Sequence, residues 1–226
     1  MRTQRFPDDA ALSQALADRL VSVLAGPYSA PVGIMLAGGS TPLAAYALLA
    51  KEKRVVSPHV RVFFSDDRHV PPDHAQSNYH NIAPSLHKAG IADEQIVRVR
   101  GEWAIEDAVR DYDRQLAAFA SSGGKMIIGF LGLGADGHTA SLFNDDDLAR
   151  SVGVNAVGVQ RPDGLKGISV TPEVLDSVEE LVFVVSGASK AKMVHNLLHA
   201  PETITAGKAV RGNAQVALWA DAAALG

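Results

Sequence analysis

A carboxylate and an imidazole lie close together in a glycine-rich segment near the middle of the chain. The segment runs from Gly132 to Phe143 and places Asp136 two positions before His138. A neutral imidazole accepts a proton near pH 7, and a nearby carboxylate can hold the ring, which suits general-base chemistry. We therefore predict His138 as a general base, and expect Gly134 and Gly137 to frame the ligand.

A second motif, Ala37-Gly-Gly-Ser-Thr-Pro42, could bind a phosphate group. Gly38 and Gly39 let the backbone approach a ligand closely, and Ser40 and Thr41 supply hydroxyls. We expect Thr41 to cap a helix with Pro42 at its first position. The free N–H groups and positive dipole end of that helix would favour an anion. The motif is not a Walker A loop, since no Gly-Lys-Ser/Thr ends it.

Two cations follow other strand patterns. Arg68 ends the motif Ser65-Asp-Asp-Arg68, and its guanidinium could form a fork with a phosphate or carboxylate. Asp66 and Asp67 could orient it or bind sugar hydroxyls. Lys190 opens a helix after a strand and could reach a phosphate as a point charge.

The sequence disfavours two other kinds of site, a metal site and a dinucleotide site. A metal site is disfavoured because the nearby residues have no familiar ligand spacing, so we expect none; they are His69, Asp73, His74 and His80. A dinucleotide site is disfavoured although Gly132, Gly134 and Gly137 satisfy G-x-G-x-x-G. The following Asn144-Asp-Asp-Asp147 is not the apolar helix that this fingerprint requires.

All four motifs begin where a strand pattern ends. Short apolar runs predict strands over 32–37, 60–65, 125–131, 155–160, 167–170, 180–186 and 215–219, with a polar loop over 66–76. Helical spacing predicts helices over 8–24, 41–51, 78–88, 104–119 and 189–199, and a short one from 172. The alternation predicts an α/β fold: a three-layer, mostly parallel, doubly wound sheet with helices on both faces. Ligands bind such sheets at the carboxyl ends of the strands.

Composition narrows the possible functions. The 226 residues carry a formal net charge of −4 with scattered Lys and Arg, so we expect no nucleic-acid or membrane partner. The absence of Cys excludes disulfides and thiolate nucleophiles. Residues 1–9 are polar and no apolar run is long enough to span a membrane, so we expect a cytoplasmic protein. We expect a single domain over 1–226, as a monomer or small homo-oligomer.

Together the motifs resemble the 6-phosphogluconolactonase family, within the sugar-phosphate isomerase-like superfamily. The resemblance rests on the order and spacing of Gly38-Gly-Ser-Thr-Pro42, Ser65-Asp-Asp-Arg68, Ser77-Asn78, Gly132 to Phe143 and Ser186-Gly-Ala-Ser-Lys190. It implies the substrate 6-phospho-D-glucono-1,5-lactone, a sugar-phosphate lactone of the oxidative pentose phosphate pathway, and no metal or organic cofactor.

The resemblance also implies roles by matching position. Gly38 to Thr41 and Lys190 would hold the phosphate, Arg68 and Asn78 would line the site, and His138 would be the general base. Either Asp66 or Asp136 would hold its imidazole.

The chain departs from the family pattern at two positions. Asp67 stands where the family usually has Glu. Gly167 stands where the family tends to have Arg before an Ile-Thr strand, so Lys166 or Arg161 would have to supply that cation.

Two further functions remain open. An aldose–ketose isomerase or glucosamine-6-phosphate deaminase would share the phosphate loop and the Asp-Gly-His motif, although the continuation Ala140-Ser-Leu-Phe143 resembles the lactonases more. A non-catalytic sugar-phosphate sensor would be expected to carry a DNA-binding segment, and none fits before Val32.

Overall fold

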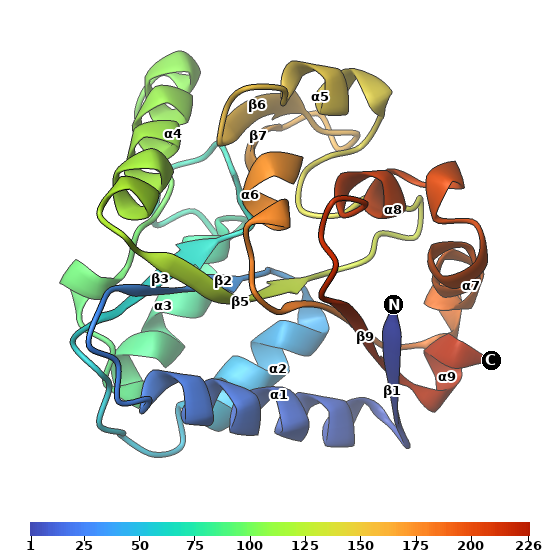
Figure 1. Cartoon of the computed structure of the whole chain (residues 1–226), viewed down its shortest axis with the longest axis horizontal. Coiled ribbons are helices and arrows are strands. Elements are labelled where there is room, and N and C mark those ends of the chain that lie inside the picture. Colours follow the sequence, from blue (N-terminus) through green and yellow to red (C-terminus); the bar gives the residue numbers. More distant parts are fainter.

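The computed structural model describes residues 1–226 and is built around a six-stranded sheet with the strand order β1-β9-β8-β5-β2-β3. Every neighbouring pair in this sheet is parallel (Figure 1). Its strands are β1 (Arg2–Phe6), β2 (Val32–Leu36), β3 (Val60–Phe64), β5 (Lys125–Leu131), β8 (Leu181–Val185) and β9 (Val216–Asp221). The predicted parallel α/β sheet is confirmed.

Helices cover both faces of this sheet, which confirms the predicted three layers. Figure 1 shows α1, α2 and α3 below the sheet and α4, α6 and α8 above it. The helices are α1 (Asp9–Leu24), α2 (Ser40–Leu49), α3 (Asn78–Ala89), α4 (Ile105–Ser121), α5 (Asp145–Arg150), α6 (Pro172–Asp176), α7 (Ala191–His199), α8 (Thr205–Ala209) and α9 (Ala222–Leu225). Short 3₁₀ turns lie at η1 (Asp93–Gln95), η2 (Ala188–Lys190) and η3 (Pro201–Thr203).

The central strands are apolar throughout because both of their faces are buried. In β8, Val182 and Val184 belong to the core beneath the sheet, whereas Phe183 and Val185 belong to the core above it. Successive side chains of a strand point to opposite faces, so a continuous apolar run fills two cores at once. Each such fully buried side chain contributes about 1.5–3 kcal/mol.

A second, three-stranded antiparallel sheet was not predicted. It has the order β4-β7-β6 and consists of β4 (Asp66–Arg68), β7 (Lys166–Val170) and β6 (Ala156–Gln160). The prediction of a polar loop from residue 66 is therefore wrong at its start. The triplet Asp66-Asp67-Arg68 has no apolar alternation, and its pairing with β7 is a tertiary contact that local sequence does not encode.

Other predictions were wrong at element ends. Helix α2 begins at Ser40 with Gly39 as its N-cap, so Thr41 is inside the helix and does not cap it. Strand β1 and the short helices α5, α8 and α9 were missed, because their polar or very short sequences lack a clear period. No helix is both long enough and apolar enough to cross a membrane.

Candidate active site

A cavity of about 200 Å³ lies at the carboxyl ends of β2, β3, β5 and β8, where the fold predicts a ligand site. The predicted site residues that line it are Gly38, Gly39, Asp66, Arg68, Asn78, Gly134, His138 and Lys190. The other predicted residues, Ser40, Thr41, Asp136 and Gly137, do not line it. Arg161, one of the two candidates for the extra cation, also lines it, and residues that were not predicted complete the wall: Ala37, Ser65, Gly132, Leu133 and Ala140.

Asp136 holds the imidazole of His138. Its Oδ1 lies 2.5 Å from Nδ1 of the ring and also accepts the His138 backbone N–H at 3.2 Å. Burial acts to raise the pKa of Asp136, but the hydrogen bond with His138 and the electrostatic interaction with its ring outweigh burial and lower that pKa. The ionised carboxylate can only accept, so Nδ1 carries the proton and Nε2 keeps its lone pair for a ligand. Of the two predicted carboxylates, Asp136 is the partner.

The backbone around this pair is constrained. A side chain at Gly134 would overlap both the His138 ring and the Asp136 carboxylate, so only glycine leaves space for the pair. Ala140, which lines the cavity, is the one non-glycine residue with a positive φ (49°). Such strained positions concentrate at functional sites. The ring of Phe143 packs on His138 with the centroids 4.4 Å apart.

Asp66 lines the cavity but has no hydrogen bond to His138. It accepts hydrogen bonds from Ser65 Oγ at 3.0 Å and Ser141 Oγ at 2.6 Å. Its Oδ2 also lies 4.0 Å from the Arg161 guanidinium. The prediction that Asp66 could hold the imidazole is therefore not supported by the geometry, which makes it a partner of Ser141 and Arg161.

Arg68 and Asn78 form one wall of the cavity. The Arg68 guanidinium donates to Asn78 Oδ1, and Asn78 Nδ2 donates to the carbonyl oxygen of Asp66 at 2.9 Å. A side chain at Gly38 would overlap the Asn78 amide, so glycine allows the loop after β2 to lie against this wall. The structure thus brings two predicted motifs, far apart in sequence, into contact.

Asp67 is buried and anchors the loop behind this wall. Its carboxylate accepts the backbone N–H groups of Arg68 (2.8 Å), Asn78 (2.6 Å) and Tyr79 (3.0 Å), and the hydroxyl of Ser77 (3.1 Å). Burial raises the pKa of Asp67 to about 6; the backbone N–H groups act against this rise, and the charge of Asp66 adds to it. Asp67 accepts the first N–H groups of α3, whose N-cap residue is Ser77, and does not line the cavity.

Thr41 was expected to bind phosphate, but its hydroxyl is already engaged. Its Oγ1 donates to Asp9 Oδ1 at 3.0 Å and lies 2.6 Å from Ser186 Oγ. Side-chain type alone did not reveal this orientation. Ala37, Gly38 and Gly39, just before the N-terminus of α2, are the part of this motif that lines the cavity, together with Lys190.

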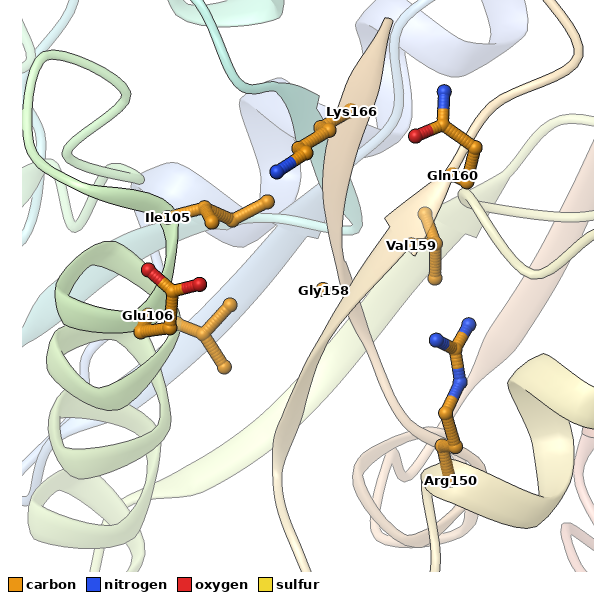
Figure 2. Close-up of a pocket in the computed structure, with 8 residues that line it drawn as sticks. Ile105, Glu106, Arg150, Gly158, Val159, Gln160 and Lys166 are labelled. Carbon is orange, nitrogen blue, oxygen red and sulfur yellow. The ribbon is translucent and has the colours of Figure 1, made fainter.

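Arg161, and not Lys166, brings the extra cation to the site. The Arg161 side chain is 10% exposed, makes an ion pair with Asp163 at 2.9 Å and donates to Ser141 Oγ at 3.0 Å. Lys166 lines a different cavity, between α4 and β6, together with Glu106 (Figure 2). Sequence reasoning named both cations but had no means of choosing between them.

The histidines of the 66–76 segment make other contacts. His69 Nε2 lies 2.8 Å from the carbonyl oxygen of Trp103, and His74 Nδ1 accepts the N–H of Gln76 at 3.2 Å. No three His, Asp or Glu side chains are grouped in a way that could hold a metal ion.

The parallel sheet, the glycine loop and the cations around an Asp–His pair define a protein of the sugar-phosphate isomerase-like class. A sequence model of the glucosamine-6-phosphate isomerases/6-phosphogluconolactonase family matches residues 7–219, and the chain belongs to this family. The resemblance stated from the motifs is confirmed.

Individual relatives agree with this assignment. The 6-phosphogluconolactonase of Treponema pallidum is 35% identical over 176 residues, which cover 74% of this chain and 73% of the relative. The human 6-phosphogluconolactonase is 31% identical over 206 residues, covering 85% and 78% of the two chains. The crystal structure of devB protein matches with a TM-score of 0.84 at 28% identity, covering 99% of this chain and 97% of that one.

Proposed function

We propose that the protein hydrolyses 6-phospho-D-glucono-1,5-lactone to 6-phosphogluconate, as a step of the oxidative pentose phosphate pathway in the cytoplasm. The observation that carries this proposal is the Asp136–His138 pair, whose ring opens into the same cavity as Arg68, Arg161 and Lys190. A base and a group of cations are what hydrolysis of an anionic ester needs. The relatives named 6-phosphogluconolactonase support the same reaction.

The phosphate group of the substrate binds between two positively charged groups of the cavity, the N-terminus of α2 and Lys190. The N-terminus of α2, reached through Gly38 and Gly39, offers free N–H groups and the positive end of a helix dipole. Lys190 adds a point charge. Anchoring this end of the substrate brings the lactone carbonyl to His138 and converts the attack into a step within one complex.

His138 acts as the general base. Its Nε2 takes a proton from a water molecule while the water oxygen bonds to the lactone carbonyl carbon, and the carbonyl becomes an oxyanion. Arg161 and the loop N–H groups stabilise that oxyanion. When the oxyanion collapses, the bond to the ring oxygen breaks and the ring oxygen takes the proton back from His138. A positioned base of this kind contributes roughly 10²–10⁴-fold in rate.

Asp136 supports both stages of this cycle. It keeps the Nδ1 proton in place when the ring is neutral and stabilises the imidazolium once Nε2 has taken its proton. The chain's own side chains supply the base, its partner and the cations, so the reaction as proposed requires no metal or organic cofactor.

A coupled assay tests the proposal. Glucose-6-phosphate dehydrogenase generates the lactone in place, and 6-phosphogluconate dehydrogenase reports the product, with a blank for spontaneous hydrolysis. We expect the wild type to accelerate lactone hydrolysis. The acceleration should fall by at least about 10²-fold in His138→Ala and be kept in His74→Ala, because His74 lies outside the cavity. Near-normal turnover in His138→Ala would reject the assigned base.

The same samples test the deaminase alternative, because the family also contains glucosamine-6-phosphate isomerases. We expect no ammonia release from glucosamine 6-phosphate. Clear release, without acceleration of lactone hydrolysis, would replace the lactonase proposal by the deaminase one.

A further inference from the structure

Three side chains from distant parts of the sequence form a hydrogen-bonded chain beside the active-site cavity. Thr41 Oγ1 lies 3.0 Å from Asp9 Oδ1 and 2.6 Å from Ser186 Oγ. Asp9 opens α1, Thr41 is in the first turn of α2, and Ser186 directly follows β8. Thr41 is only 5% exposed. A buried hydroxyl with two partners is a fixed structural link and not a free ligand group.

The direction of these two hydrogen bonds follows from the number of hydrogens that each group can donate. A hydroxyl has a single hydrogen to donate, and the ionised Asp9 carboxylate can only accept. The Thr41 proton therefore goes to Asp9, and Ser186 must donate its own to Thr41 Oγ1. Hydrogen bonds that end on a charged acceptor are the stronger kind, so Asp9 fixes both hydroxyls in one arrangement.

These hydrogen bonds join the segment after β2 to the turn after β8, and both segments contribute residues to the cavity wall. Thr41 follows Gly38 and Gly39 in the loop after β2, and Ser186 begins the turn that carries Lys190 after β8. Strands β2 and β8 are not neighbours, because β5 lies between them. The hydrogen bond between Thr41 and Ser186 therefore connects segments that follow strands on either side of β5, and the loop after β5 carries His138.

The turn that carries Lys190 is fixed at its other side as well. The backbone N–H of Gly187 donates to both carboxylate oxygens of Asp221, at 3.0 and 3.1 Å. The Lys190 N–H donates in turn to the Gly187 carbonyl at 3.0 Å. With its far side held by Asp221, the turn depends on Ser186 and Thr41 for its position relative to the glycine loop.

We propose that Thr41 and Ser186 are positioning residues that hold Lys190 at the correct distance from the glycine loop, and so set the affinity of the site for a phosphate group. This inference rests on the proposed phosphate-binding role of these two loops. It assigns to Thr41 a task different from direct contact with the phosphate. It also predicts that the two hydroxyls affect binding of a phosphorylated ligand and leave the chemical step at His138 largely unchanged.

The test compares Thr41→Val, which keeps the shape and removes the hydroxyl, with Thr41→Ser, which restores it. For the phosphorylated lactone we expect KM to rise about tenfold in Thr41→Val and kcat to stay within about twofold. Hydrolysis of unphosphorylated glucono-1,5-lactone should change less than about twofold. Thr41→Ser should restore KM, and Ser186→Ala should raise it in the same direction. Thr203→Val, which removes a hydroxyl bonded to Ala200 O away from the cavity, is the control.

Equal losses on both lactones, or an unchanged KM in Thr41→Val and Ser186→Ala, would overturn the inference. A wild-type protein without lactonase activity would instead reject the proposed function. In that case the binding of inorganic phosphate, measured by calorimetry, still tests the positioning role of Thr41 and Ser186. Weaker binding in Thr41→Val than in the wild type supports this role, and equal binding overturns it.

Discussion

The side chain of Arg161 occupies the space that a side chain at Gly167 would fill. A Cβ atom at position 167 would lie 3.2 Å from Cδ and 3.3 Å from Cγ of Arg161. Gly167 pairs with Arg68 across β4 and β7, and directly paired residues point their side chains to the same face. The glycine therefore gives Arg161 access to the face from which Arg68 projects. This arrangement explains how the chain supplies a cation here without an arginine at position 167.

Moving the arginine from position 161 to position 167 tests this relationship. Arg161→Ala should lower kcat/KM by about 10–100-fold, since it removes a charged donor from the cavity. The double variant Arg161→Ala with Gly167→Arg should recover part of that loss, because the new guanidinium starts in the vacated space. Gly167→Arg alone should destabilise the protein, since both side chains then compete for one volume.

Lys166→Ala provides the matched control, because Lys166 lies in the neighbouring strand position but lines the other cavity. Its kcat/KM should match that of the wild type. A loss in Lys166→Ala comparable to that in Arg161→Ala would show that the wrong cation has been assigned.

The carboxylate of Asp136 should control how His138 responds to pH. In Asp136→Asn the imidazolium loses its charged partner, so protonation of the ring becomes less favourable. We expect kcat to fall roughly 10²-fold, less than for a fully buried triad carboxylate. The acidic limb of the kcat/KM profile should move to lower pH. A profile with an unmoved acidic limb would mean that Asp136 does not act on the base.

Asp67 should make the stability of the protein depend on pH. Burial raises the pKa of Asp67 from 3.8 to about 6, so the native state binds this proton more tightly than the unfolded chain does. The stabilising contribution is complete below the unfolded pKa and is lost as the pH rises through about 6. It amounts to on the order of 3 kcal/mol of unfolding free energy.

Thermal unfolding of the wild type and Asp67→Asn at about pH 4 and about pH 7 measures this contribution. The variant cannot ionise at this position, so the difference between the two proteins isolates Asp67. The wild type should have its larger advantage at the lower pH. The exposed Asp73→Asn serves as a control from the same segment, and a difference that is constant between the two pH values would contradict the prediction.

The apolar runs were enough to predict the main sheet, because strands such as β8 must fill two cores and have no polar positions. The motifs at the strand ends located the cavity for the same reason: parallel strands bring their carboxyl ends to one edge. Strand β4 could not be predicted in this way, because Asp66-Asp67-Arg68 is polar and pairs only through tertiary contacts.

The roles of individual side chains were harder to predict than their location. Asp66 and Asp136 are the same residue type, and only the 2.5 Å contact identifies Asp136 as the partner of His138. Thr41 belongs to a motif that looks like a phosphate loop, but its hydroxyl points to Asp9 and Ser186. Sequence shows which groups are available, whereas the partners that a buried group chooses depend on residues far away in the chain.

Gly137 should be needed for catalysis although it does not line the cavity. Its φ is +88°, and a Cβ atom there would lie 2.9 Å from Cβ and Cγ2 of Ile204. Gly137→Ala therefore combines backbone strain with a clash against a buried side chain. The adjacent His138 would have to move, so we expect a stability loss of about 1–3 kcal/mol and a fall in kcat of more than about tenfold.

Gly153→Ala separates these two effects, because Gly153 also has a positive φ (+77°) but has open space around its Cβ position. Thermal unfolding should show a loss of stability in both variants, since both carry the backbone strain. Lactone turnover should fall only in Gly137→Ala, where the clash with Ile204 displaces the loop that carries the base. Equal turnover in the two variants would show that the position of His138 tolerates movement of this loop.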